Sequence, residues 1–448
     1  MKIIKASTPW LCSSDRLRDL ALSIVDADYL LWNNEEFCVD MAEPEIRRMA
    51  AVAEDCSADM VYADSREIVD GHLCPHPRID CQDGALRDDF DFGPVVLFRA
   101  SSFSRGVQET GEDYGYAALY DLRLRMGNIV HLKEELYTES AKPAATEEEA
   151  QFAYVKASNR EIQIEMEKAC TRHLERIGAC LPLPPPPPAI SRDDYAVEAS
   201  VIIPVLNREK TIADAVQSAL GQQTAFSYNV IVVDNHSTDG TSRILRDIAL
   251  KDDRLVVLTP SRKDLGIGGC WNLAVQSRYC GKYAVQLDSD DIYSGPDSLA
   301  RIVSEFGNGE KAMVIGSYTI VDFNLNPLPP GLIDHREWTD ANGHNNALRI
   351  NGFGAPRAFR TDLLELYPMP NVSYGEDYAA TLRLSGMYRI GRIFENLYFC
   401  RRWGGNSDSN LSLERLNRNN YYKDSIRTIE LKSRQLRRGE RYGKTAAE

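Results

Sequence analysis

The chain has 448 residues, 43% of them hydrophobic and 26% charged, and its formal net charge is −14. This composition is typical of globular domains and excludes a wholly disordered or fibrous chain, and the length favours two or three domains. The acidic balance argues against a nucleic-acid partner. The sequence contains neither an apolar run long enough to cross a bilayer nor a signal-peptide core, so we expect a cytoplasmic protein with ten reduced cysteines.

Residues 1–145 contain a weak copy of a pattern that returns later in the chain. Tyr29–Asn34 parallels Tyr283–Asp288, and Phe98-Arg99 parallels Phe359-Arg360, at offsets of 254 and 261 residues. Only 28 residues precede Tyr29, too few for the three strand–helix units expected before Tyr283. We therefore expect an α/β half-domain that is related to the later fold and is not catalytic.

Residues 146–198 are expected to form a helical connector followed by a polyproline linker. Thr146 is a candidate helix N-cap, and Gly178 follows the last residue with helical spacing. The five consecutive prolines Pro184–Pro188 cannot donate backbone hydrogen bonds and favour an extended polyproline helix. This pattern predicts a semi-rigid spacer between two domains.

Residues 199–410 alternate short β-rich runs with helical segments. The predicted strands are Val201–Val205, Val230–Asp234, Leu255–Thr259 and Tyr283–Leu287. Strands alternating with helices predict a mostly parallel α/β sheet. Ligands of such sheets bind beyond the carboxyl ends of the strands, so the polar residues that follow each strand are the first candidates for a site.

Two pairs of carboxylates carry the strongest chemical signals. Asp288 and Asp290 follow a strand one residue apart, and oxygen ligands at this spacing can hold Mg²⁺ or Mn²⁺. The alternative is an Asx turn that caps the next helix. Glu376 and Asp377 begin a predicted helix, where one of them is a candidate general base. Favourable charge at a helix N-terminus is the alternative for Glu376.

Five segments of residues 199–410 together resemble one family. They are IIPVLNRE, IVVDNHSTDGT, DLGIGGCWN, Asp288–Asp291 and Gly375–Asp377, in that order. The region resembles a family 2 glycosyltransferase with the Rossmann-like GT-A fold of nucleotide-diphospho-sugar transferases. The resemblance implies a metal-dependent, inverting transfer from a UDP- or GDP-sugar to a hydroxyl of a glycan or lipid-linked acceptor, in glycan or cell-envelope polysaccharide synthesis.

The resemblance also implies roles for individual residues. Asp288 and Asp290 match the DxD motif that holds the divalent metal, Mn²⁺ or Mg²⁺. Asp377 matches the catalytic base, with Glu376 as the alternative. The positions that match contacts to the donor nucleotide are Pro204, Asn207, Glu209, Asp234, Asp264, Asn272 and Asp288.

Two further polar segments supply candidate contacts to the diphosphate, the sugar or the acceptor. Many relatives carry a metal-binding histidine after the last strand, where this chain has Arg401, Arg402 and Trp403. These three residues are expected to contact the diphosphate or the sugar, or else to form a surface cluster. Residues 329–353 form a polar, aromatic insertion that suits an acceptor sugar, although an ordinary polar loop has the same composition. The candidate acceptor contacts within it are His335, Trp338, His344 and Asn345.

Residues 411–448 contain ten Lys or Arg and five Asp or Glu. A basic helix of this kind either makes a peripheral contact with an anionic membrane or packs back on the catalytic domain.

For the whole chain, two further functions stay open: a nucleotidyltransferase, which would release pyrophosphate, and a glycan-binding protein with a decayed site.

Overall fold

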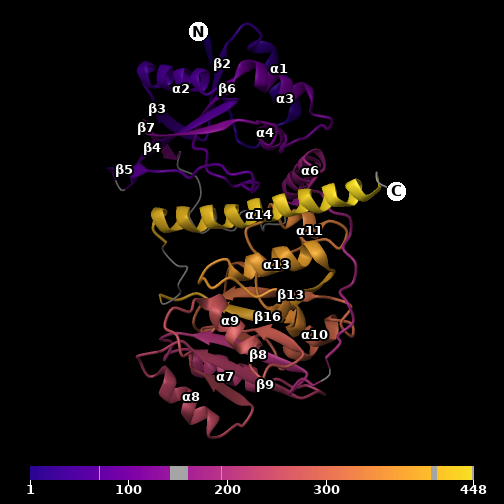
Figure 1. Ribbon diagram of the computed structural model, residues 1–448. Helices are drawn as coiled ribbons and strands as arrows, with labels where there is room; N and C mark the ends of the chain where they lie inside the picture. The colour runs from indigo at the N-terminus through magenta and orange to yellow at the C-terminus, as the bar shows by residue number, and fades with distance from the viewer. Residues whose placement is uncertain (70, 142–159, 193, 405–410, 446–448) are drawn as a thin grey trace. The chain divides into compact units, whose positions relative to one another are not determined.

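The computed structural model describes residues 1–69, 71–141, 160–192, 194–404 and 411–445. The chain forms two compact units (Figure 1). The first comprises Met1–Cys180 together with Leu411–Glu448, and the second comprises Leu181–Asn410. Among the described helices, none combines the length and the apolar character needed to cross a bilayer.

The first unit is built on one mixed sheet. Its strands follow the spatial order β1-β2-β6-β4-β7-β3, and β5 pairs with β4. The strands are β1 (Ile3–Thr8), β2 (Tyr29–Asn34), β3 (Phe37–Asp40), β4 (Met60–Val69), β5 (His72–His76), β6 (Val95–Arg99) and β7 (Ile129–Ala141). The helices are α1 (Ser14–Ser23), α2 (Glu43–Asp55), α3 (Ala100–Gln108), α4 (Ala118–Arg123), α6 (Arg160–Arg176) and α14 (Leu413–Thr445).

The second unit has the mixed α/β sheet that the strand–helix alternation predicts. Its strands follow the order β10-β9-β8-β11-β15-β13-β16-β12, and β14 pairs with β13. The strands are β8 (Ala199–Val205), β9 (Tyr228–Asp234), β10 (Leu255–Leu258), β11 (Tyr283–Gln286), β12 (Ile292–Tyr293), β13 (Met313–Val321), β14 (Pro327–Ile333), β15 (Arg357–Arg360) and β16 (Ile390–Arg401). The helices are α7 (Ile212–Leu220), α8 (Thr241–Ala249), α9 (Ile267–Val275), α10 (Ser298–Glu305), α11 (Gly343–Asn346), α12 (Thr361–Leu366) and α13 (Glu376–Met387).

The four strands predicted from the sequence are β8, β9, β10 and β11, and they pair in parallel. Val201, Val230 and Val285 from three of these strands are fully buried in one core cluster. Apolar side chains on a strand that is covered on both faces explain why the sequence reads as continuous hydrophobic runs there. This arrangement confirms the predicted fold class and brings the carboxyl ends of the parallel strands to one edge.

Six strands of each sheet follow the same order and the same directions. In the first unit Tyr29 is paired with Arg99, and in the second Tyr283 is paired with Arg360. In both sheets the first two of these six strands pair in parallel, β1 with β2 and β8 with β11. The second sheet continues beyond β8 with β9 and β10, and the described part of the first unit has no counterparts of these two strands. The common topology extends over the segments of the sequence repeat, and a shared origin of the two units stays a prediction.

The polyproline segment differs from the predicted spacer, because it belongs to the second unit. The carbonyl of Pro185 accepts a hydrogen bond from the main-chain N–H of Arg389 (3.0 Å). The carbonyl of Pro188 accepts one from the guanidinium of Arg360 (2.7 Å). A polyproline helix makes no internal hydrogen bonds, so its carbonyls are free to bind neighbouring donors. The predicted N-cap at Thr146 lies outside the described residues.

The C-terminal helix α14 is grouped with the first unit. This differs from the expectation that it packs on residues 199–410, which was the alternative to a peripheral membrane contact. The main-chain N–H of Gly84 donates to the hydroxyl of Thr428 on this helix (2.9 Å). Two of its arginines form ion pairs within the helix, each at 2.8 Å: Arg427 with Asp424 and Arg434 with Glu430. Both guanidiniums are buried, so they are not part of an exposed basic surface.

Candidate active site

The candidate site of the second unit lies at the carboxyl ends of its parallel strands. Asp234 ends β9, Arg208 follows the end of β8, and Asp288 follows the end of β11. Because these strands run in parallel, their carboxyl ends share one edge of the sheet. The end of β16 also reaches this edge, since the main-chain N–H of Arg401 donates to Asp291.

Residues Asp288–Asp291 form an acidic turn after β11, and Asp291 anchors this turn to β16. One carboxylate oxygen accepts the hydroxyl of Tyr398 (2.9 Å), and the other accepts the main-chain N–H of Arg401 (2.7 Å). Burial, with added repulsion from the charges of Asp288 and Asp290, raises the pKa of Asp291 well above its usual range. Both of its oxygens are therefore used in holding the turn.

Asp288 is oriented from within its own strand. Its Oδ1 accepts a hydrogen bond from the side-chain amide of Gln286 (2.9 Å). Burial raises the pKa of Asp288; the charge of Arg357 opposes this shift, and the charges of Asp290 and Asp377 add to it. Concentrated negative charge of this kind suits a cation, which would stabilise the ionised carboxylates.

Asp290 points towards positively charged and aromatic neighbours. Its Oδ2 accepts a hydrogen bond from the indole of Trp403 (3.3 Å) and lies 3.8 Å from Nε of Arg208. Arg401 instead supports the turn from behind: its guanidinium donates to the carbonyl of Asp290 and pairs with Asp214 (2.9 Å). The side chain of Arg401 is only 3% exposed, so the predicted contact with diphosphate or sugar fits Trp403 better than Arg401.

The acidic turn fits a divalent cation that also binds phosphate. The described residues include no group of three or more His, Cys, Asp or Glu arranged to hold a metal. Two carboxylates of the turn, Asp288 and Asp290, are separated by one residue and carry the hard oxygen ligands that Mg²⁺ and Mn²⁺ prefer. Such an ion would take its other ligands from water or from phosphate oxygens.

Asp377 and Glu376 have different surroundings at the start of α13. Oδ2 of Asp377 lies 2.8 Å from the guanidinium of Arg357, a pairing that favours the ionised carboxylate. Glu376 is 8% exposed, and burial, followed by the charge of Asp377, raises the pKa of Glu376 to about 8. At neutral pH Glu376 is therefore mainly protonated, while Asp377 is paired with the guanidinium of Arg357.

Two predicted nucleotide contacts, Asn207 and Glu209, join the first two loops at the sheet edge. Oδ1 of Asn207 accepts the main-chain N–H of Thr238 (2.7 Å), and Oε2 of Glu209 accepts that of Gly240 (2.9 Å). Asn207 has a φ of 54°, a conformation that asparagine tolerates better than most residues. These hydrogen bonds hold the loop after β8 against the loop after β9.

Asp234 and Pro204, also predicted to contact the nucleotide, are largely occupied within the fold. Asp234 is 4% exposed, accepts the main-chain N–H of Ser237 (3.0 Å) and accepts the hydroxyl of Ser242. Pro204 lies inside β8, opposite Val233 of β9. Both carboxylate oxygens of Asp234 therefore hold the loop after β9, and Pro204 is part of the strand β8.

Asp264 and Asn272 occupy the third loop and the following helix. Asp264 is exposed and pairs with Arg262 (2.5 Å), so it is open to a ligand. The side chain of Asn272 is engaged: it donates to the carbonyl of Met369 (2.8 Å) and accepts the N–H of the same residue (3.0 Å). Asn272 therefore positions the segment before α13.

The polar insertion does not form the open acceptor site that its composition suggested. Its four candidate residues are buried, with exposed fractions of 2% to 5%: His335, Trp338, His344 and Asn345. The imidazole of His344 and the amide of Asn345 bind the main chain of Leu181 at the start of the polyproline segment. The imidazole of His335 is paired with the carboxylate of Glu337 (2.7 Å). Polar composition was a poor guide here, because these side chains bind groups of this same unit. Arg402, which the sequence analysis grouped with Arg401 and Trp403, follows β16 and donates its main-chain N–H to the carbonyl of Val321 (2.7 Å).

The sequence analysis missed four residues that shape the site: Gln286, Arg357, Tyr398 and Arg208. The amide of Gln286 interrupts the otherwise apolar run Tyr283–Leu287, which was an available signal. Arg357 had no such local signal, since its role depends on the pairing of distant segments.

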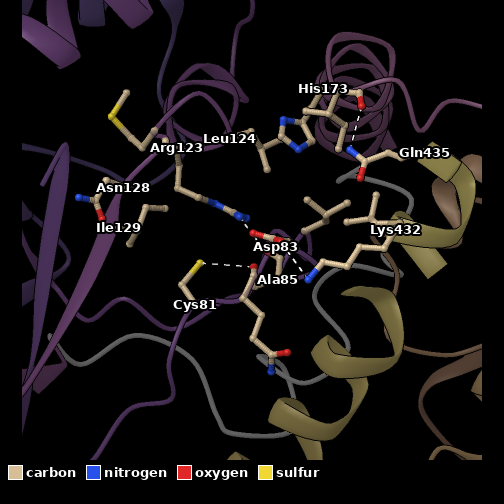
Figure 2. A pocket seen from close by; sticks show the side chains of 16 residues that line it. Cys81, Asp83, Ala85, Arg123, Leu124, Asn128, Ile129, His173, Lys432 and Gln435 are labelled. Carbon is tan, nitrogen blue, oxygen red and sulfur yellow. Dashed lines mark hydrogen bonds and ion pairs between the residues drawn. The ribbon is translucent and has the colours of Figure 1, made fainter. Parts of the chain in front are cut away.

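The first unit has its own cavity of about 520 Å³, lined by residues of α4, α6 and α14 (Figure 2). Its polar groups largely bind one another. Arg123 donates to the carbonyl of Ala85 (2.6 Å), and Lys432 lies 3.7 Å from Asp83. This cavity contains none of the residues predicted for catalysis.

Residues 200–364 match the family model for glycosyl transferase family 2. A segment of 108 residues is 41% identical to chondroitin synthase from Escherichia coli, covering 24% of this chain and 15% of that protein. Over 132 residues the chain is 31% identical to UDP-Glc:alpha-D-GlcNAc-diphosphoundecaprenol beta-1,3-glucosyltransferase WfgD from Escherichia coli, covering 30% of this chain and 49% of that protein. The chain thus spans about half or less of the length of these curated relatives.

Among solved structures, S. aureus TarS in complex with UDP-GlcNAc is similar at 21% identity and a TM-score of 0.40, covering 53% of this chain and 72% of that chain. The similarity to glycosyl transferase family 2 extends over residues 200–364 of the second unit, which has a mixed α/β fold.

Proposed function

We propose that the protein transfers a sugar from a nucleotide-diphospho-sugar, a UDP- or GDP-sugar, to a hydroxyl of a glycan or lipid-linked acceptor. The relatives that match this domain include a chondroitin synthase and a glucosyltransferase with a UDP-Glc donor. The strongest support is the proximity of two kinds of carboxylate. Asp288 and Asp290 lie in the acidic turn after β11, and Asp377 pairs with Arg357 (2.8 Å) of β15, the strand hydrogen-bonded to β11.

In this proposal Asp377 is the general base. It accepts the proton of the acceptor hydroxyl while the hydroxyl oxygen attacks the anomeric carbon and the bond from that carbon to the diphosphate breaks. Attack on the face opposite the leaving group inverts the anomeric configuration. Glu376 is less suited to this role, because its raised pKa, about 8, keeps it largely protonated at neutral pH.

Asp288 and Asp290 would hold a Mn²⁺ or Mg²⁺ ion, which when bound supplies positive charge to the departing diphosphate. Arg208, 3.8 Å from Asp290, offers a further positive charge at the same place. Trp403 beside Asp290 provides an aromatic surface for the donor.

The test is product analysis after the full chain is incubated with UDP- and GDP-sugars and Mn²⁺. We expect release of the nucleoside diphosphate, abolished by Asp290→Ala. Asp252→Ala is the matched control, because Asp252 pairs with Arg254 near the start of β10. Release of pyrophosphate would instead identify a nucleotidyltransferase. A chain that neither consumes nor binds any donor would contradict the proposal and favour a glycan-binding role.

A further inference from the structure

Gln286 joins the acidic turn to the neighbouring strand β15. It is 3% exposed and makes two side-chain hydrogen bonds. Its Oε1 accepts the main-chain N–H of Arg357 (3.1 Å), and its Nε2 donates to Oδ1 of Asp288 (2.9 Å). A main-chain N–H can only donate, so the amide oxygen must face Arg357 and the amide nitrogen must face Asp288. The orientation of this amide is therefore fixed by the hydrogen bonds themselves.

The side chain of Arg357 continues the connection towards α13. One terminal nitrogen lies 2.8 Å from Oδ2 of Asp377 and also donates to the carbonyl of Gly354. The side chain is only 15% exposed, so the ion pair is largely shielded from water. A partly buried, charge-assisted contact of this type holds a carboxylate in a defined orientation more firmly than an exposed ion pair does.

We propose that Gln286 and Arg357 form a positioning bridge that fixes Asp288 and Asp377 relative to each other. The bridge runs from Asp288 through the Gln286 amide to the main chain of Arg357, and from its guanidinium to Asp377. The inference depends on the proposed function, because it assigns Asp288 to the donor and Asp377 to the acceptor. Neither Gln286 nor Arg357 is assigned contact with the reacting atoms.

The chemistry explains why such a bridge is useful. Transfer in one step requires the activated hydroxyl and the anomeric carbon to be in line, and small displacements of either partner slow it strongly. Asp377 and Asp288 belong to segments that are 89 positions apart in the chain, so local structure cannot fix their separation. The antiparallel pairing of β11 with β15 supplies the register, and the two side chains extend it to the carboxylates.

A role in packing alone does not account for Gln286. Its neighbours Tyr283, Ala284 and Val285 in β11 are apolar and buried, and an apolar residue would fill this position without the cost of burying an amide. That cost is offset only when both ends of the amide are hydrogen-bonded, as they are here. The position therefore favours an amide because its two hydrogen bonds orient the carboxylate of Asp288 and the main chain of Arg357.

The experiment compares Arg357→Ala, Arg357→Lys and Gln286→Leu with the wild-type full chain, using the donor that supports nucleoside diphosphate release. For Arg357→Ala we expect kcat to fall about 100-fold with little change in the KM of the donor. The lysine variant should retain part of the rate, since it keeps the charge but not the guanidinium geometry. Low concentrations of guanidinium should partly restore the alanine variant, which a loss of folding would not permit.

Gln286→Leu tests the donor side of the bridge. We expect Mn²⁺ binding, measured by titration with Mn²⁺ and UDP or GDP, to weaken about 10- to 100-fold, because a residue that orients a metal ligand is lost. Mn²⁺ binding is therefore the measurement for this half of the bridge.

Arg254→Met is the matched control for Arg357→Ala, since it removes an arginine that pairs with Asp252 at 2.7 Å elsewhere in this unit. The rate of Arg254→Met should be unaffected by guanidinium.

The positioning bridge and the proposed function are contradicted by different results. An active wild-type enzyme whose rate is unchanged by Arg357→Ala, or whose alanine variant is not restored by guanidinium, would overturn the bridge alone. Unchanged Mn²⁺ binding in Gln286→Leu would overturn its donor half. A wild-type chain that releases no nucleoside diphosphate from any donor would overturn the proposed function and the bridge with it.

Discussion

Gly268 and Glu376 meet where the start of α9 lies against the start of α13: a Cβ atom at Gly268 would lie 2.9 Å from Cβ of Glu376. The same Cβ would collide with the main-chain carbonyl of Pro370, which cannot move aside as a flexible side chain would. The glycines of this segment therefore serve close packing of the start of α9 against residues 370–372, which lead into α13. Their packing sets the position of the residues at the start of α13.

Gly268→Ala should lower the free energy of unfolding of the second unit by about 1–3 kcal/mol, the usual cost of overpacking. Urea denaturation measures this change. Gly352→Ala is the control, because nothing lies within 4 Å of a Cβ at Gly352. Equal midpoints for Gly268→Ala and the control would show that the contact between α9 and α13 is not tight.

Glu376 makes stability depend on pH in a defined direction. Burial, followed by the charge of Asp377, raises the pKa of Glu376 from its ordinary 4.5 to about 8. The folded state thus holds a proton that the unfolded state releases between these values, so this contribution to stability is complete below pH 4.5 and is lost as the pH rises through about 8. Glu376→Gln should flatten that decline in urea midpoints recorded with EDTA present. Parallel pH profiles for the two proteins would contradict this prediction.

In the first unit, Gly84 lies close to the main chain of α14. A Cβ there would lie 2.6 Å from main-chain atoms of Arg427 and Asp424 on α14. We expect Gly84→Ala to loosen this helix and cost about 1–3 kcal/mol. Limited proteolysis should then cut α14 faster than in Gly111→Ala, where the added Cβ meets nothing within 4 Å. Equal cutting rates would mean that α14 does not depend on this contact.

The acidic turn should bind Mn²⁺ in the absence of any donor. Because a ligand that binds only the folded state stabilises it, Mn²⁺ should raise the Tm of the wild type after EDTA treatment. Asp290→Ala should remove most of this shift, whereas Asp252→Ala should keep it. Equal shifts in wild type and Asp290→Ala, read by differential scanning fluorimetry, would place the cation elsewhere.

The core of the second unit was predictable because its information is local. Apolar runs such as Val230–Asp234 and the polar residues after them gave the parallel strands β8 to β11 and the edge at which the site lies. The acidic turn was found for the same reason. The sheet order beyond β11, in which β15 and β13 run antiparallel to each other, is set by contacts between distant segments and could not be read from the chain.

Individual side-chain roles were harder to predict for the same physical reason. His344 and Asn345 looked like sugar ligands, but their partner is the main chain of Leu181, 163 and 164 positions away. Arg357 carries no motif, and only the pairing of β15 with β11 places it beside the carboxylates. A sequence pattern indicates which residues can do chemistry, while burial and long-range partners decide which of them are available for it.

The most direct test of the central claim is the rate of nucleoside diphosphate release by Asp377→Asn at saturating donor, acceptor and Mn²⁺. The account predicts a loss of at least about 100-fold, typical of a missing general base, with binding of UDP or GDP and Mn²⁺ unchanged. Glu376→Gln, assayed in parallel, should keep most of the activity. A wild-type rate in Asp377→Asn, or a greater loss in Glu376→Gln, would contradict the division of roles between these two carboxylates.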